Sequence, residues 1–277
     1  MTDSIGRTIN YLRISVTDRC NLRCVYCMPP DGVRLLPHST ILSYDEITNF
    51  AAFAVSKGIR KIRITGGEPL VRRGIEQLIA MLAAIDGLND LSLTTNGHLL
   101  QEKAALLKSA GLHRVNISLD TLDRVQYSTL TRGGNLQNVL LGILAAQRVG
   151  LSPVKINCVI NIESSEKEDP FKKEQQEVLK ETMRQFAQNN GLHIRFIRQM
   201  SLVQGNFSIV EGGSGGDCSH CNRLRLTANG MIKPCLFSHL DYDIRSLGYE
   251  EALASALRHK PFKGTHNPTG SFYGIGG

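Results

Sequence analysis

The sequence contains no tryptophan, and aromatic residues make up only 6% of its 277 positions. It also lacks any run close to the roughly 18 consecutive apolar residues of a membrane-spanning helix, so we expect no membrane partner. Residues 1–7 contain no apolar stretch of the kind that a secretory signal needs, which predicts a cytoplasmic protein. The length suits one large domain, or a barrel with an extension.

Long runs of lysine and arginine are absent as well, although the net charge is +7. Because the positive charge is scattered, nothing resembles a polybasic arm, and we expect no nucleic-acid partner. The same charge suits a small polyanion such as a nucleoside triphosphate.

Cysteine is present in an odd number, and six of the seven residues fall into two groups of three. Without a secretion signal, metal or redox chemistry is a better interpretation than a disulfide framework. The seventh, Cys158, lies inside an apolar run and is interpreted as a buried thiol without a role.

The first group, Cys20, Cys24 and Cys27, has the spacing C-x3-C-x2-C. A cubane cluster of four irons and four sulfides takes four thiolates, and no fourth cysteine lies nearby. The simpler interpretations are buried thiols or a zinc site, which also needs four ligands. The nearest histidine, His38, stands eleven residues after Cys27, so the spacing favours a cluster with one iron open to a small molecule.

With an aromatic residue before its last cysteine, this group resembles the signature of the radical S-adenosylmethionine (SAM) enzymes. The resemblance implies a [4Fe–4S] cluster whose open iron binds SAM. It also implies that an electron from the cluster cleaves SAM and forms a 5′-deoxyadenosyl radical. The positions that match SAM contacts in that superfamily are Tyr26, Gly67, Ser118 and Met200.

Six short apolar runs are predicted as strands, at residues 11–17, 61–65, 91–95, 114–119, 154–160 and 193–197. Helix-periodic segments lie between them, at residues 44–57, 74–85, 99–110, 136–149 and 178–188. Such alternation predicts right-handed βα units on a parallel sheet. Polar residues follow four of the strands, at the edge where barrel enzymes build their active sites. Because only six units fit, we expect an α/β fold, a partial, open (β/α)6 TIM-like barrel.

The segment 163–176 is charged and aperiodic, and it is predicted as a solvated loop. A glycine-rich connector at 201–216 marks the predicted boundary between a barrel domain, residues 1–200, and a C-terminal extension, residues 201–277. The extension contains one predicted helix, at 249–259, and a tail rich in proline and glycine.

The second group, Cys218, Cys221 and Cys235, has the spacing C-x2-C-x13-C. By spacing alone, a zinc ribbon with His220 or His239 as fourth ligand has roughly even odds. An iron–sulfur cluster is the other interpretation.

Residues 221–227, 229–230 and 233–236 around this group closely resemble the GTP 3′,8-cyclase family, also called molybdenum cofactor biosynthesis protein A. The resemblance runs from Arg13 to the end of the chain. It implies a second [4Fe–4S] cluster on these cysteines, carried by the extension, whose open iron meets the purine of GTP. The chain departs from the family at Gln199, where an acidic residue is usual, in the charged loop, and in its short connector.

Three basic residues, Arg13, Arg63 and Lys155, lie inside predicted strands. A cation inside a barrel is costly unless it meets an anion, although each could instead point outward into water. The resemblance places GTP contacts at Arg13, Arg63, Thr94, Lys155, Arg223 and Arg225. It assigns support of the radical chemistry to Arg223, Arg225, Gly276 and Gly277.

The resemblance thus implies a lyase that converts GTP to 3′,8-cyclo-7,8-dihydro-GTP, the first step of molybdenum cofactor biosynthesis. Its partners would be GTP, a reducing electron donor and the cyclic pyranopterin monophosphate synthase that takes up the product, with the chain a monomer or homodimer. One alternative is a radical SAM peptide-modifying enzyme with an auxiliary cluster. Another is a ferredoxin-like or zinc-ribbon nucleic-acid-binding module, which does not explain the βα alternation.

Overall fold

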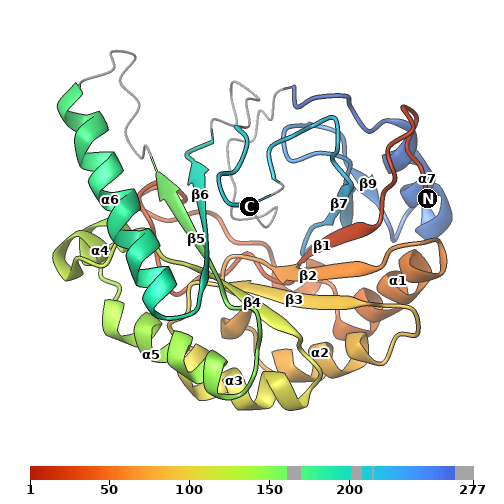
Figure 1. Cartoon of the computed structure of the whole chain (residues 1–277). Coiled ribbons are helices and arrows are strands. Elements are labelled where there is room, and N and C mark those ends of the chain that lie inside the picture. The colour runs from red at the N-terminus through yellow and green to blue at the C-terminus, as the bar shows by residue number, and fades with distance from the viewer. Residues whose placement is uncertain (161–169, 201–207, 214, 266–277) are drawn as a thin grey trace.

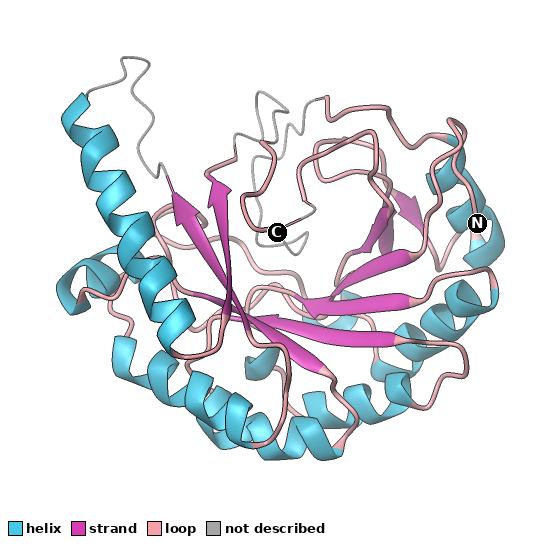
Figure 2. Ribbon diagram, in the orientation of Figure 1, coloured by secondary structure: helices cyan, strands magenta, loops and turns pink. Residues whose placement is uncertain are grey.

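The computed structural model describes residues 1–160, 170–200, 208–213 and 215–265, the side chains of 170–173 excepted (Figure 1). Within these residues, nine strands form one open sheet in the order β6-β5-β4-β3-β2-β1-β7-β8-β9. Helices cover the convex face of the curved sheet, as Figure 2 shows. The concave face is left for the polar residues described below.

The first six strands are parallel, and each pairs with the next one along the chain. They confirm the six predicted strands, with ends that differ by at most two residues. The strands are β1 (Tyr11–Ser15), β2 (Lys61–Thr65), β3 (Asp90–Thr95), β4 (Arg114–Ser118), β5 (Lys155–Ile160) and β6 (His193–Arg198).

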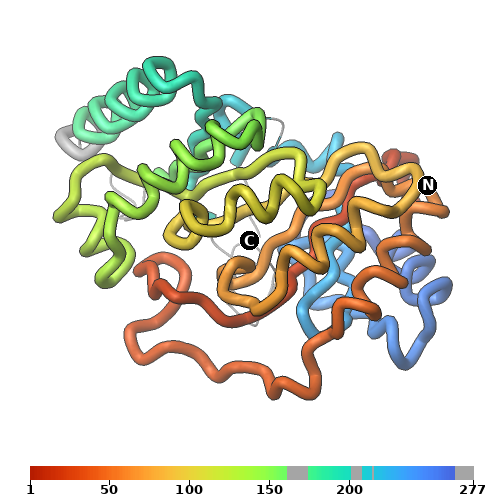
Figure 3. The backbone as a smooth tube through the Cα atoms, turned by 90° about the horizontal axis from the view of Figure 1, so that it is seen from below, coloured from red at the N-terminus to blue at the C-terminus, as the bar shows by residue number. Residues whose placement is uncertain are grey.

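The helices that connect these strands lie side by side on the outer face (Figure 3). Predicted helices are confirmed as α1 (Tyr44–Ser56), α2 (Ile75–Ala83), α3 (Leu100–Ser109), α5 (Leu136–Arg148) and α6 (Pro170–Asn189). The sequence prediction missed the short helix α4 (Arg124–Thr131) and the 3-10 turns η1 (His38–Thr40) and η2 (Pro69–Val71).

The predicted loop at 163–176 is wrong from Pro170 onward, because α6 begins there. Proline is favoured at the first position of a helix, and the lysine, glutamate and glutamine residues at 172–177 are good helix formers. Because this polar run lacks the apolar periodicity by which we recognised helices, the sequence pattern did not show where the helix begins.

Alternation along the strands gives the sheet one apolar and one polar face. In β1, Leu12 and Ile14 are buried in the core that the helices cover, whereas Arg13 between them lies on the other face. The helices contribute matching apolar faces. Helix α1 begins with a capping box between Ser43 and Glu46 and buries Phe50. The core therefore lies between sheet and helices, and the strands direct their polar residues into the barrel.

The C-terminal part continues the same sheet. Strand β7 (Arg223–Leu226) runs parallel to β1, and β8 (Met231–Lys233) and β9 (Tyr242–Asp243) follow antiparallel to their neighbours. The predicted helix at 249–259 is confirmed as α7 (Gly248–Arg258). The division after residue 200 stays a prediction, since both parts contribute strands to one sheet. No helix in the described ranges combines the length and the apolar character that crossing a membrane requires.

Candidate functional site

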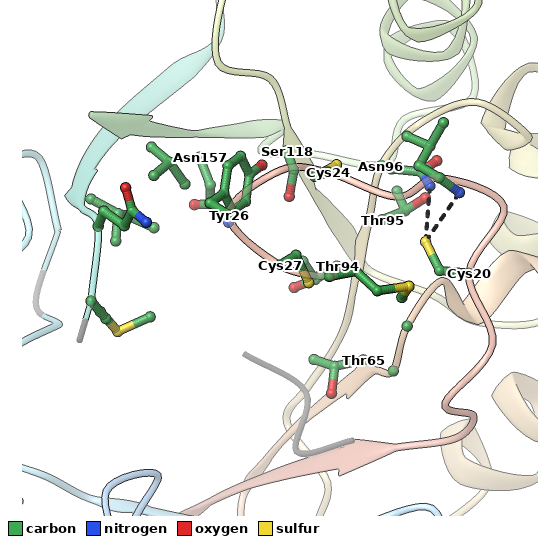
Figure 4. Close-up of a pocket in the computed structure, with 18 of the residues that line it drawn as sticks. Cys20, Cys24, Tyr26, Cys27, Thr65, Thr94, Thr95, Asn96, Ser118 and Asn157 are labelled. Atoms are coloured by element: carbon green, nitrogen blue, oxygen red, sulfur yellow. Dashed lines mark hydrogen bonds between the residues drawn. The ribbon is translucent and has the colours of Figure 1, made fainter. Parts of the chain in front are cut away.

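One pocket lies at the C-terminal ends of the parallel strands (Figure 4). The first cysteine group comes from the loop after β1, and its thiols line this pocket. All four residues that match SAM contacts line it too, although they come from four different parts of the chain: Tyr26, Gly67, Ser118 and Met200. The fold thus brings together residues that the sequence separates by more than a hundred positions.

The turn after β2 packs directly on the loop that carries the cysteines. The amide of Gly67 donates to the carbonyl of Thr17 at 2.8 Å, and the amide of Glu68 donates to that of Arg19 at 2.8 Å. A Cβ atom on Gly67 would lie 2.3 Å from the Arg19 carbonyl oxygen. Only glycine fits, so the residue is required by the contact between two loops as well as by any ligand.

Glu68 is a buried residue of the site that the sequence reasoning did not assign. Its carboxylate accepts hydrogen bonds from the amide of Leu70 at 2.9 Å, the hydroxyl of Thr95 at 2.8 Å and the amide of Asn96 at 2.7 Å. Burial raises its pKa to about 7. The side chain therefore fixes the glycine turn to the end of β3. Its position directly after two glycines was the available sequence signal.

Asp120, after β4, was also left without a role. Its carboxylate accepts from the hydroxyl of Tyr26 at 2.7 Å and from the amide of Val159 at 2.8 Å. Burial raises the pKa of this carboxyl to about 6. Asp120 thus holds the ring of Tyr26 in place.

The thiols of this pocket are poor acids in their surroundings. Burial, aided by the neighbouring thiols and Asp120, raises the pKa of Cys24 to about 12. Burial and Cys20 raise the pKa of Cys27 to about 11. Because thiolates are the species that bind metals, these groups need a strongly cationic centre such as an iron cluster to ionise. Three such thiols at one pocket fit that group.

The arrangement gives no support to a single-ion site. In the described ranges, no three His, Cys, Asp or Glu side chains lie as a mononuclear metal site requires. Zinc–sulfur bonds of about 2.3 Å would draw the sulfurs of a closed zinc site to within roughly 4 Å of one another. Neither His220 nor His239 lines the pocket formed by the second cysteine group.

The predicted GTP contacts of the central strands form a row on the concave face. In the strand register, Arg13 stands opposite Arg63 of β2 and opposite Arg225 of β7. Burial and the charge of Arg225 lower the pKa of Arg13 well below its usual range. Mutual repulsion of this kind is relieved by an anion, so the row is suited to a polyanionic ligand.

Two further basic residues of the strands face this row. Arg195 of β6 was missed, although it stands inside a strand like the residues that were singled out. Burial lowers its pKa, as does the charge of Arg63. Lys155 is affected in the same way by burial and by Arg195. Arg114, in contrast, is held by Asp90 through contacts of 3.0 and 2.5 Å, so its charge is already balanced.

Thr94 supplies an independent sign of a ligand. Its hydroxyl is buried and has no hydrogen-bond partner among the residues that the structure describes, yet it lines the first pocket. The strand register places Thr94 beside Asn116, which in turn stands beside Lys155. A buried hydroxyl without a partner is costly, and a bound polar molecule would satisfy it.

The second cysteine group lines a separate pocket with Arg223 and Arg225. Burial alone would raise the pKa of Cys221, but the charges of Lys260 and Arg223 outweigh it and lower the pKa to about 7. The structure therefore brings all three predicted cysteine ligands together with both predicted arginines. Gly276 and Gly277 lie outside the described residues, as do residues 201–207 and 214 of the connector.

Three thiols beside these cations fit an iron–sulfur cluster, whose sulfurs accept hydrogen bonds and whose thiolate ligands carry negative charge. The two cysteine groups differ in the charges around them. The buried carboxyl of Asp120 lies near the first group, whereas Lys260 and Arg223 bring positive charge to the second.

Comparison with known proteins finds similar sequences over most of the chain. A model of the radical SAM superfamily matches residues 14–173. The GTP 3′,8-cyclase of Petrotoga mobilis is 40% identical over 319 aligned residues, covering 96% of this chain and 95% of that protein. The GTP 3′,8-cyclase of Geobacter sulfurreducens is 43% identical over 279 residues, covering 88% and 86%. Because the first alignment is longer than this chain, the chain lacks segments that the Petrotoga protein has.

Solved structures confirm the partial barrel. The anSMEcpe protein with bound AdoMet superposes with a TM-score of 0.65 and 14% identity, covering 92% of this chain and 81% of that one. Streptococcus suis SuiB superposes with a TM-score of 0.62 and 15% identity, covering 93% and 67%. At such low identity the likeness establishes the fold and nothing further.

Proposed function

The chain belongs to the radical SAM superfamily and, within it, to the GTP 3′,8-cyclases, and we propose how its residues perform that reaction. The enzyme converts GTP to 3′,8-cyclo-7,8-dihydro-GTP. The observation that carries the proposal is the row of cations on the concave face. In it, Arg13 stands in register with Arg63 and also with Arg225, which lines the second cysteine pocket.

Cys20, Cys24 and Cys27 hold the first [4Fe–4S] cluster in this proposal. When bound, that cluster supplies the electron that cleaves SAM to methionine and a 5′-deoxyadenosyl radical. Tyr26, fixed by Asp120, contacts the adenine from inside the cluster loop. Gly67 at the amino end of SAM, Ser118 at its carboxylate or ribose, and the backbone of Met200 at its adenine complete the SAM site. These four positions fix where the radical forms relative to the bound nucleotide.

GTP binds across the concave face, with its triphosphate on Arg13, Arg63, Lys155 and Arg195. A triphosphate carries about four negative charges, and a site crowded with cations offsets them. Thr94 donates its unpartnered hydroxyl to the same ligand. Arginine's planar fork suits phosphate and ribose oxygens, which agrees with arginine at three of the four phosphate positions.

Cys218, Cys221 and Cys235 hold a second [4Fe–4S] cluster beside the purine. Arg223 and Arg225 lie next to it, where they bind the substrate and assist the closing steps of the reaction. Gly276 and Gly277 complete the site by the family resemblance. The product then passes to the synthase that forms cyclic pyranopterin monophosphate.

The nucleic-acid-binding module is ruled out by the superfamily match. The peptide-modifying alternative is not favoured, because the relatives over most of the chain are named GTP 3′,8-cyclases. An anaerobic incubation with SAM, a reductant and GTP tests the proposal. We expect the cyclised nucleotide and 5′-deoxyadenosine to form in equal amounts. SAM cleavage without consumption of GTP would point to another substrate.

A further inference from the structure

Lys260 is a buried cation next to the second cysteine pocket. It follows α7 and is only 3% exposed, yet in the described part of the chain it forms no ion pair with a carboxylate. Burying an ammonium group costs several kcal/mol unless an anion or a full set of hydrogen bonds compensates. What compensates Lys260 is therefore informative about the pocket.

The hydrogen bonds of the ammonium group go to the two cysteine segments. The Nζ atom donates to the carbonyl of Arg223 at 2.7 Å and to the carbonyl of Pro234 at 2.6 Å. Lys260 also lines the second pocket together with Cys221 and Cys235. Since an ammonium group has three donors, these two hydrogen bonds leave one donor for a group in the pocket.

These contacts join the two segments that supply Cys221 and Cys235. Arg223 lies two residues after Cys221, and Pro234 directly precedes Cys235. One side chain thus sets the spacing between two cysteines that lie fourteen positions apart in the chain. Burial lowers the pKa of Lys260, whereas the charges of the Cys221 and Cys235 thiolates raise it.

The remaining cysteine is held by a second buried cation. Arg7 pairs with the buried Asp3 at 2.6 Å and donates to the carbonyl of Cys218 at 2.8 Å. It also donates to the carbonyl of Pro261 at 2.8 Å, which follows Lys260 in the chain. The N-terminal segment therefore anchors the short stretch that places Lys260.

We propose that Lys260 is a positioning residue of the second iron–sulfur site, where its ammonium group, held in the pocket beside Cys221 and Cys235, raises the reduction potential of the cluster. The inference rests on the proposed function, because it takes a cluster to occupy this pocket. Hydrogen bonds to the sulfurs and nearby positive charge stabilise the more negative, reduced state of a cluster. The two carbonyl hydrogen bonds keep the ammonium group in the pocket.

The test is a redox titration of the anaerobically purified holoenzyme, followed by magnetic resonance. The variants are Lys260→Met, which removes the charge, and Lys260→Arg, which keeps it. Lys263→Met, an exposed lysine three residues further on, is the matched control. The first cluster, identified by its response to SAM, is an internal reference in every sample.

For Lys260→Met we expect the equilibrium constant for reducing the second cluster to fall at least tenfold, which is about 59 mV for one electron. Selective loss of that cluster, with the first cluster and SAM cleavage retained, also supports the proposal. Lys260→Arg should restore the reduction potential and the content of the second cluster. An unchanged reduction potential of the second cluster in Lys260→Met overturns the proposal. Loss of both clusters in Lys260→Met that is not restored in Lys260→Arg also overturns it. Iron for only one cluster in the unmodified enzyme would instead refute the proposed second cluster.

Discussion

The two cysteine groups have the same number of thiols but opposite electrostatic surroundings. Around the first group lie two buried carboxyl groups, Glu68 and Asp120, and the pKa of Cys24 rises to about 12. Around the second lie buried cations, and the pKa of Cys221 falls to about 7. The sequence spacing alone shows none of this contrast.

The difference matches the charges of the two proposed ligands. SAM carries a positive sulfonium group, and the carboxyl groups of Glu68 and Asp120, which contact lining residues of the first pocket, suit it. GTP is a polyanion, and it meets Arg13, Arg63 and the arginines of the second pocket. The number of thiols therefore does not determine which ligand a pocket binds. In our proposal, the charges around the thiols select the molecule that binds the open iron of each cluster.

Replacing one cysteine in each group gives the largest expected effect. Cys24→Ser should abolish 5′-deoxyadenosine formation, because the first cluster is the electron source. Cys221→Ser should remove about half of the iron, as two cubane clusters become one, but leave SAM cleavage measurable. Iron analysis and chromatography of 5′-deoxyadenosine report the two effects.

Cys158→Ser is the control for both variants, since Cys158 is fully buried outside the two groups. SAM cleavage that survives Cys24→Ser would contradict the first assignment. Iron content that survives Cys221→Ser would contradict the second.

A smaller effect is expected when the first pocket loses the charge of Asp120. In Asp120→Asn the side-chain oxygen still accepts from Val159, and the amide group donates to the Tyr26 hydroxyl, so the shape is kept. The native carboxyl has its pKa raised from 3.8 to about 6, so the folded chain binds a proton more tightly than the unfolded chain. Stability from this group is complete below about pH 4 and is lost as the pH rises through 6.

The asparagine variant does not suffer this loss. Its unfolding free energy, relative to the unmodified iron-free chain, should therefore increase by about 3 kcal/mol between pH 4 and pH 7.5. Urea unfolding at several pH values measures the difference. Asp123→Asn is the control, because Asp123 is an exposed helix cap and asparagine caps equally well. If the difference in unfolding free energy between the two chains does not change with pH, folding does not raise the pKa of Asp120.

Much of the fold followed from the sequence because its determinants are local. Strands β1 to β6 are short apolar runs between helices. The alternation of strands and helices predicts the parallel sheet, and the number of strands predicts its open form. Strands β7 to β9 escaped prediction because they are only two to four residues long. Helix α6 was placed too late because its residues 172–177 are all polar.

The site was predictable where motifs carry it and not where tertiary contacts do. The cysteine spacing and the glycine turn are visible in the chain, and the structure gathers those residues into two pockets. Lys260 acts on Cys221 from 39 positions away, and Asp120 holds Tyr26 from 94 positions away. No local pattern marks such partners, since each depends on which strand ends meet.

The cations of the concave face should separate GTP binding from SAM binding. Alanine at Arg13, Arg63 or Arg195 removes a charge-assisted phosphate contact, at a cost of about 1.5–3 kcal/mol in GTP affinity. SAM affinity should stay near that of the unmodified enzyme. Equilibrium binding of each ligand measures both, with the exposed Arg148→Ala as control. Unchanged GTP affinity in all three variants would place the triphosphate elsewhere.

The smallest expected effect concerns the thiols themselves, in chain freed of iron. At pH 8 the thiol of Cys221 is mostly ionised, whereas that of Cys24 is ionised only to about one part in ten thousand. A thiolate of lower pKa is intrinsically less nucleophilic, with a Brønsted slope of about 0.45, which offsets part of this advantage. Alkylation of Cys221 should therefore be about 50-fold faster than that of Cys24.

Both thiols are of intermediate exposure, so access of the reagent does not decide the comparison. Mass spectrometry of the alkylated peptides reports the two rates. Equal rates in the unmodified chain would remove the electrostatic contrast between the two groups.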